Sequence, residues 1–215
     1  MPRLENMPSL RRLDRTVIVT RGASTPSLER LHNGDILMSY RIKHPPPAPI
    51  DLKSWNGQVI RSRDGGRTWS EPILTIKRNH PNDPPGFLPY IGMMQLPNGP
   101  ILLPCRGGDG GVFLLRSEDN GDSWTSPTRV GHNLDGVNDW QSLNPYGKIR
   151  LLSDGTLIMP VWGRFHGERY GFTGHLRSTD GGITWDEFII VARGHVFYND
   201  TIELPDGRLM AVIGN

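Results

Sequence analysis

Ser62–Trp69 reads SRDGGRTW, and the same pattern returns at Ser117–Trp124 (SEDNGDSW) and at Ser178–Trp185 (STDGGITW). The shared pattern is Ser-x-Asp-x-Gly-x-Ser/Thr-Trp, and its copies begin 55 and 61 residues apart. Self-similarity at a near-constant period is the signature of a repeat architecture. Asp and Ser side chains bond nearby backbone amides, and Gly supplies the positive φ of a tight turn. We therefore predict that each copy closes a β-hairpin, with its Trp packed under the turn.

The segments on either side of the pattern look like strands. The runs before the three copies are Gln58–Arg61, Val112–Arg116 and Gly174–Arg177. Those after them are Pro72–Ile76, the weaker Pro127–Val130, and Phe188–Val191. The aspartates of the pattern could be read as catalytic. A catalytic site is seldom present in three copies, however, whereas a fold element is, so we interpret the pattern as structural.

A second repeat alternates with the first. Four apolar hairpins turn at Asn-Gly or Asp-Gly, namely Leu28–Tyr40, Met93–Pro104, Ile149–Val161 and Ile202–Ile213. Asn-Gly or Asp-Gly between two apolar runs is the strongest short-range hairpin signal. The alternation gives three four-stranded units and then the first half of a fourth. Four-stranded antiparallel units that repeat around an axis are the blades of a β-propeller.

The eight-residue pattern resembles the Asp-box of bacterial neuraminidase repeats (BNR), which occurs in sialidases and other β-propellers. The resemblance implies an all-β fold, a β-propeller of four-stranded antiparallel blades that has six blades when complete. About three and a half blades are expected here. They form one sialidase-like domain over residues 1–215, incomplete at the C-terminus, with blades at about 24–76, 90–130 and 146–191 and half a blade at about 198–215. The alternative is an open array that pairs with another copy of itself.

Composition limits the function classes. Glycine and proline supply 26 and 19 of 215 residues, as expected for a turn-rich β chain. The 24 basic and 22 acidic residues nearly balance, which argues against a nucleic-acid partner. Cys105 is the single cysteine, so an internal disulfide is excluded, and we interpret it as a buried side chain rather than a nucleophile. No histidine pair has metal-ligand spacing, so neither a metal nor any other cofactor is predicted.

The sequence contains no secretory signal and no apolar run near the ~20 residues of a membrane span. A cytoplasmic or unknown location and no membrane partner are therefore expected. Unpaired strand edges would favour self-association.

Strand order indicates which end of the propeller could carry a site. In a four-stranded meander, the Gly turns and the Asp-boxes lie at one end, and the longer loops lie at the other. Function tends to reside on loops that a rigid scaffold holds. The loops here are rich in His, Asp, Arg, Trp and Tyr, which suits a polar ligand such as a glycan. Among them are Arg41, Arg106, Trp140, Arg164, Arg169 and Tyr170.

The resemblance to sialidases also implies site residues. Such enzymes bind the carboxylate of sialic acid with several arginines, because forked guanidinium groups match carboxylates. They use an acidic residue as general acid and a tyrosine as nucleophile. Arg41 closes the second strand, where the family has an Arg, and Asp51 is the candidate general acid. The alternative interpretation is that Asp51 is an ordinary solvated loop aspartate without a catalytic role. Ser24 stands where the family has the Arg of an Arg-Ile-Pro segment, which removes one arm of the clamp.

Further positions follow from the same resemblance. Asp83 matches, loosely, a position that touches the substituents of the sugar. Tyr198-Asn199-Asp200-Thr201 is similar to an Asn-Glu-Thr run of sialidase-like proteins, so Asp200 is a candidate catalytic residue and Tyr198 a candidate substrate contact. Asp200 is about two residues closer to the turn than the family glutamate, and its side chain is one methylene shorter. We also assign Trp140 and Arg164 to substrate binding.

Three functions remain open at this point. The first is a sialidase-like glycoside hydrolase of the exo-α-sialidase type, or a fragment of one, that acts on the terminal sugars of glycans. The second is a non-catalytic glycan-binding propeller that has lost the arginine clamp. The third is a propeller enzyme that acts on another sugar with a carboxylate pair. A tyrosine and two arginines in later blades would favour the first.

Overall fold

The computed structural model describes residues 19–20, 22–43, 55–77, 87–89, 92–132, 134, 140–196 and 198–214. Every regular element within these ranges is a β-strand, and all strand pairs are antiparallel. None of the described segments forms a helix with the length and apolarity that a membrane crossing requires. The all-β prediction is confirmed.

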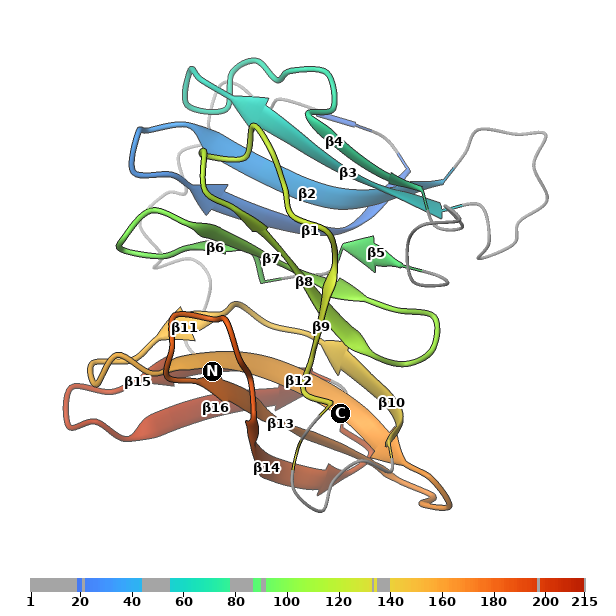
Figure 1. The fold of residues 1–215 in the computed structure, drawn as a ribbon. Helices are drawn as coiled ribbons and strands as arrows, with labels where there is room; N and C mark the ends of the chain where they lie inside the picture. The colour runs from blue at the N-terminus through green and yellow to red at the C-terminus, as the bar shows by residue number, and fades with distance from the viewer. Residues whose placement is uncertain are drawn as a thin grey trace, which may run out of the picture.

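The strands form three sheets and a hairpin (Figure 1). Sheet 1 has the order β1 (Ala23–Arg30), β2 (Ile36–Lys43), β3 (Trp55–Ser62) and β4 (Leu74–Lys77). Sheet 2 has β5 (Leu88–Pro89) and β6 (Met94–Gln95) on β7 (Ile101–Arg106), then β8 (Val112–Ser117) and β9 (Thr128–Val130). Sheet 3 has β10 (Trp140–Pro145) and β11 (Arg150–Leu151) on β12 (Leu157–Phe165), then β13 (Gly171–Ser178) and β14 (Glu187–Gly194). The hairpin pairs β15 (Tyr198–Glu203) with β16 (Leu209–Gly214).

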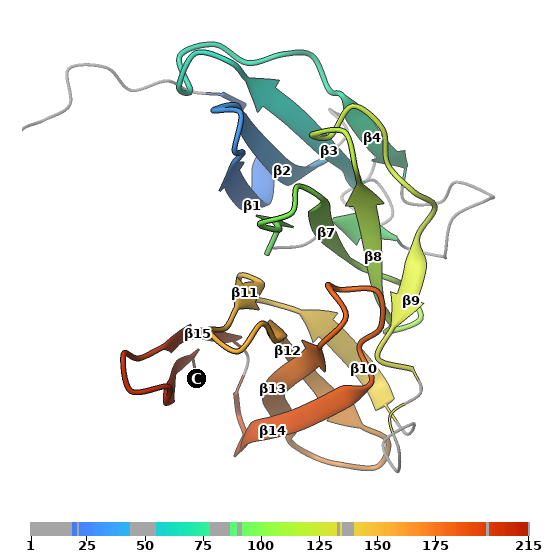
Figure 2. The ribbon, with the colours of Figure 1, turned by 60° about the vertical axis from the view of Figure 1, so that its left-hand side comes forward.

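Each sheet therefore has four strand positions, because β5 with β6, and β10 with β11, are two pieces of one inner strand. The sheets follow one another around a common axis (Figure 2). One apolar cluster lies between sheets 1 and 2 and includes Leu37 and Leu103. A larger one lies between sheets 2 and 3 and includes Leu102 and Met159. These observations confirm the predicted β-propeller blades, with sheets 1 to 3 as complete blades and β15–β16 as half of another.

One element begins earlier than predicted. The third blade was expected to start at about residue 146, but β10 already pairs Trp140–Pro145 with β12. Leu143 and Asn144 are buried there. The segment reads WQSLNP and contains one aliphatic residue, so it lacks the alternation of apolar and polar residues that identifies a strand. Its place comes from pairing with β12 and not from its own apolar pattern.

The Asp-box turns are built alike. In the first, the Asp64 carboxylate accepts hydrogen bonds from the Thr68 backbone amide (2.9 Å) and hydroxyl (2.6 Å). Asp119 accepts the corresponding bonds from Ser123 at 2.8 and 2.6 Å. The Trp indole N–H of each box donates to a glycine carbonyl of its own turn at 3.2 Å. Polar groups within each Asp-box thus serve as hydrogen-bond partners for one another, which supports the structural interpretation.

Acid is expected to loosen these turns. The hydroxyl and amide donors of Thr68 and Ser123 lower the pKa of Asp64 and Asp119 from the ordinary 3.8 to about 2. Because the folded-state pKa is the lower one, this stabilisation is complete above about pH 4 and is lost as the pH falls toward 2. The unfolding temperature should therefore fall through this range, and Asp119→Asn should reduce the dependence. An Asp119→Asn curve with the wild-type slope between pH 4 and 2 would contradict this.

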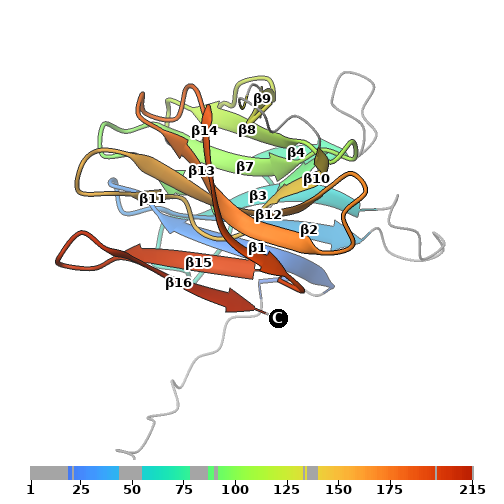
Figure 3. The same ribbon diagram turned by 90° about the horizontal axis from the view of Figure 1, so that it is seen from below.

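The two ends of the propeller differ. The Gly turns and the Asp-box turns lie to the left in Figure 1, and the β7–β8 and β12–β13 loops lie to the right. We call these the turn end and the loop end. Figure 3 shows the strands of the successive sheets running between these two ends. The predicted separation of the Gly turns and Asp-boxes from the other loops is present, but the described loops at the loop end, residues 107–111 and 166–170, are shorter than the Asp-box turns.

Candidate functional site

Arginines lie at or near the loop-end termini of the second strands of three successive sheets. Arg106 is the last residue of β7, Arg164 the second-last of β12 and Arg41 the third-last of β2. They follow the turn glycine of their hairpin by nine residues for Arg164 and by seven for the other two. Side chains alternate between the two faces along a strand, and offsets of seven and nine differ by two residues. The three arginines therefore lie on the equivalent face of each sheet.

Arg41 is held by the beginning of β1. Its backbone pairs with Ser24, and its Nε donates a hydrogen bond to the Thr25 hydroxyl. Thr25 has a φ of +48°, which is unusual for a β-branched residue, and the β1–β2 register shifts between Ser24 and Ser27. Backbone strain of this kind clusters at functional sites. The segment that the resemblance aligns with Arg-Ile-Pro is thus an irregular strand start, and its Thr25 hydroxyl orients Arg41.

Arg106 was named among the loop residues but was not assigned to substrate binding. It pairs with Leu88 on one side and Val112 on the other. Its Nε is buried, and no atom in the described part of the chain accepts a hydrogen bond from it. Its spacing from the Asn-Gly turn equals that of Arg41, so the repeat contained a signal for it.

Arg164 lies in a hollow at the loop end of sheet 3. The hollow has a volume of about 330 Å³ and is lined by Trp162, Arg169, Tyr170 and His195, among others. The Arg169 guanidinium lies 5.3 Å from the centre of the Tyr170 ring, and the Tyr170 and His195 rings meet edge to face at 4.7 Å. Cationic and aromatic groups together suit a polar ring that carries negative charge.

The other predicted site residues are placed as follows. Trp140 and Tyr198 begin β10 and β15 at the loop end, and Trp140 pairs with Phe165, the neighbour of Arg164. Asp200 lies two residues into β15, where the Arg150 guanidinium binds it at 3.1 Å and the Thr201 amide donates to it at 3.0 Å. Asp51 and Asp83 lie outside the described residues.

Trp140 and Arg164 therefore both lie at the loop end of sheet 3, whereas Arg41 belongs to sheet 1. Asp200 pairs with Arg150 rather than with one of the loop-end arginines. Arg169, Tyr170 and His195 were not assigned to the site from the sequence, because only the fold shows that Tyr170 and His195 meet. Across the described ranges, no group of three or more His, Cys, Asp or Glu side chains is arranged to hold a metal ion.

Comparison with known proteins agrees with this architecture. The BNR/Asp-box repeat family matches residues 60–71 and 176–187, which contain the first and third copies of the pattern. A sialidase of Clostridium perfringens is 27% identical over 145 residues, which cover 61% of this chain and 34% of that protein. An exo-alpha-sialidase of Arthroderma benhamiae is 29% identical over 198 residues, which cover 84% and 45%. This chain thus spans less than half the length of these two relatives.

A solved structure extends the likeness to the fold. The Hadza microbial sialidase Hz136 superposes with a TM-score of 0.72 at 19% sequence identity. The superposition covers 91% of this chain and 42% of that one. At this identity the likeness concerns the fold alone.

Proposed function

The chain belongs to the sialidase superfamily of β-propellers with BNR/Asp-box repeats, and from this premise we propose that it forms part of a glycoside hydrolase of the exo-α-sialidase type. Its loop end binds the acidic terminal sugar of a glycan. The observation that carries the proposal is the recurrence of Arg41, Arg106 and Arg164 at the loop end of three successive blades. Guanidinium groups bind a carboxylate in paired, charge-assisted hydrogen bonds.

Each arginine has a distinct local setting for this task. Arg41 is oriented by Thr25, and orientation in advance lowers the entropic cost of binding. Arg106 has a buried Nε without an acceptor among the described residues, so a ligand oxygen would satisfy it. Arg164 stands beside the aromatic groups of the hollow, which supply an apolar face to a sugar ring.

Two acidic residues complete the proposal. Asp51 acts as the general acid and Asp200 as the second acidic group, as the resemblance to the family implies. Glycosidases place acidic groups on both sides of the scissile bond, and sialidases use a tyrosine nucleophile instead of a carboxylate. Asp83, Trp140 and Tyr198 contact the sugar substituents.

Binding of N-acetylneuraminic acid tests the proposal. The chain is expected to bind the acid, and Arg164→Ala should weaken the binding by about tenfold or more, because a hydrogen bond to a charged group contributes about 1.5–3 kcal/mol. The matched control is Arg208→Ala at the turn end, where Arg208 is exposed and pairs with Asp206. It should leave the dissociation constant unchanged, and the methyl ester of the sugar should bind weakly to every variant. Absence of binding, or equal weakening by both substitutions, would refute the proposal.

A second candidate function is a non-catalytic glycan-binding propeller. The observation in its favour is Ser24, which occupies the position of an Arg in the resembling family and pairs with Arg41 in β2. Turnover of a fluorogenic sialoside by the complete polypeptide would decide for the hydrolase, and binding without turnover would decide for this alternative.

A further inference from the structure

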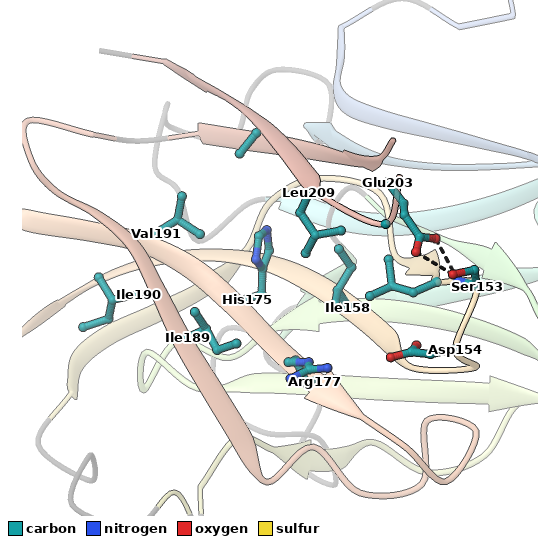
Figure 4. Close-up of a pocket in the computed structure, with 13 residues that line it drawn as sticks. Ser153, Asp154, Ile158, His175, Arg177, Ile189, Ile190, Val191, Glu203 and Leu209 are labelled. Atoms are coloured by element: carbon teal, nitrogen blue, oxygen red, sulfur yellow. Dashed lines mark hydrogen bonds between the residues drawn. The ribbon is translucent and has the colours of Figure 1, made fainter. Parts of the chain in front are cut away.

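Two hollows border sheet 3, and they differ in the partners of their charged side chains. The groove between sheet 3 and the hairpin β15–β16 has a volume of about 590 Å³, and Arg177 and Glu203 are among its lining residues (Figure 4). Arg177 binds the Glu187 carboxylate at 3.0 Å. Glu203 accepts hydrogen bonds from the Ser153 amide at 2.7 Å and the Ser153 hydroxyl at 2.6 Å. The Arg177 guanidinium and the Glu203 carboxylate are therefore already engaged by protein groups.

The hollow at the loop end of sheet 3, of about 330 Å³, has a different charge pattern. Arg164 and Arg169 line it, and no aspartate or glutamate is among its described lining residues. Within the described ranges, neither guanidinium forms an ion pair with a carboxylate. Two positive charges without such a partner favour an anionic ligand.

The carboxylate next to Arg169 in the sequence has another partner. Glu168 is the only acidic residue of the β12–β13 loop, and it binds the Arg193 guanidinium of β14 at 2.9 Å. The same guanidinium lies 5.2 Å from the centre of the Phe165 ring. Because Arg193 compensates the charge of Glu168, the charge of Arg169 stays available to a ligand.

The positive charge of sheet 3 is displaced toward the loop end. Trp162 follows its turn glycine by seven residues, which is the offset of Arg41 and Arg106 in their own sheets. Arg164 comes two residues later, about 7 Å farther along the strand, and Arg169 belongs to the loop beyond it. An aromatic ring thus occupies the level at which sheets 1 and 2 place a guanidinium. The displacement is comparable to the length of one sugar residue.

Aromatic rings give the hollow apolar faces. Trp162 is half-buried, Tyr170 is 42% exposed, and the His195 ring meets the Tyr170 ring edge to face. All three residues line the hollow. Its volume lies near the lower end of the roughly 300–1,000 Å³ that is typical of small-molecule pockets. The hollow therefore suits a single sugar ring with a negatively charged substituent.

From these observations we infer that the hollow binds a second sugar residue, the neighbour of the terminal acidic sugar, and that this neighbour also carries a negative charge. The inference rests on the proposed function and narrows its substrate class to glycans with two adjacent charged sugars. Arg164 lies between the two sugars, and Arg169 binds the charged group of the second one. Trp162 and Tyr170 contact the second ring. A carboxylate and a sulfate ester would both supply the charge.

The test compares dissociation constants of glycans that differ in the second sugar. Sialyllactose has a neutral second sugar, disialic acid has a second carboxylate, and sialyllactose sulfated on its galactose has a sulfate ester. At least one of the two doubly charged glycans is expected to bind about tenfold more tightly than sialyllactose, as for one added hydrogen bond between charged groups. The tighter of the two identifies the charged group. Arg169→Gln should bring this ratio close to one, and Arg169→Lys should retain part of it.

Arg208→Gln is the matched control, because it removes the same charge from an exposed arginine at the turn end. Its ratio should equal that of the wild type. Equal dissociation constants for the three glycans would overturn the inference and leave the proposed function standing, whereas absence of binding by every sialoside would refute both. A ratio that survives Arg169→Gln would likewise contradict the inference, because the charge of Arg169 would then have no part in selecting the second sugar.

Discussion

Trp185→Ala is expected to lower the free energy of unfolding by about 3–5 kcal/mol, the range found for large buried aromatic residues. The Trp185 side chain is 3% exposed and belongs to the apolar cluster between sheets 2 and 3. Its indole N–H donates to the Gly182 carbonyl, and Gly182 is the residue that packs on Leu102. The substitution therefore removes a core side chain and a turn contact together. Urea unfolding followed by circular dichroism measures the loss.

Trp69 provides the matched comparison. It makes the same indole hydrogen bond within its own box, but its ring is half-buried and packs against a small cluster of Met38, Tyr40 and Ile60. Trp69→Ala should therefore cost clearly less than Trp185→Ala. If the two substitutions had equal effects, or if Trp185→Ala cost less than about 1 kcal/mol, burial between blades would not be the source of the stability.

Glu29→Ala is expected to cost about 2–3 kcal/mol, because it leaves a buried backbone donor without an acceptor and breaks an ion pair. The Glu29 side chain, 10% exposed, accepts a hydrogen bond from the Gln95 amide at 3.0 Å and binds the Lys148 ammonium at 2.7 Å. Glu29 belongs to β1, Gln95 to β6, and Lys148 lies between β10 and β11. One carboxylate thus connects the inner strands of three blades.

Two variants isolate this connection. Glu29→Gln keeps an acceptor for the Gln95 amide but loses the charge. It should therefore lower the free energy of unfolding, but by less than Glu29→Ala does. Glu118→Ala removes a carboxylate that is 65% exposed and pairs with Arg116, and exposed pairs contribute about 1 kcal/mol or less. If Glu29→Ala and Glu118→Ala lowered the free energy of unfolding equally, the Glu29 contact between blades would contribute no more to stability than an exposed ion pair does.

The repeated turns explain how much of the fold could be predicted. Each Asp-box and each Asn-Gly or Asp-Gly turn is a local device, so the hairpins followed from residues that are adjacent in sequence. The strand β10 could not be found in this way, because WQSLNP is placed by its pairing with β12. Neither could the differing burial of Trp69 and Trp185, since burial depends on which blade covers the turn.

The candidate site shows the same division. Arg41 could be proposed from the resemblance to sialidases, which have an Arg where the second strand ends, and its spacing from the Asn-Gly turn identifies Arg106 once the blades are aligned. The hollow around Arg164 involves Tyr170 and His195, which lie 25 residues apart and meet only because β13 and β14 pair. Contacts between distant loops, and ion pairs such as that of Glu29 with Lys148, require the assembled sheets.

The most direct test of the central claim, that the loop end is the sugar site and the Asp-box end is structural, is the N-acetylneuraminic acid titration followed residue by residue by amide NMR. The predicted result is a set of shift changes around Arg41, Arg106 and Arg164, with the three Asp-boxes unaffected. Shift changes centred on the Asp-box turns, or no changes at the loop end, would contradict it.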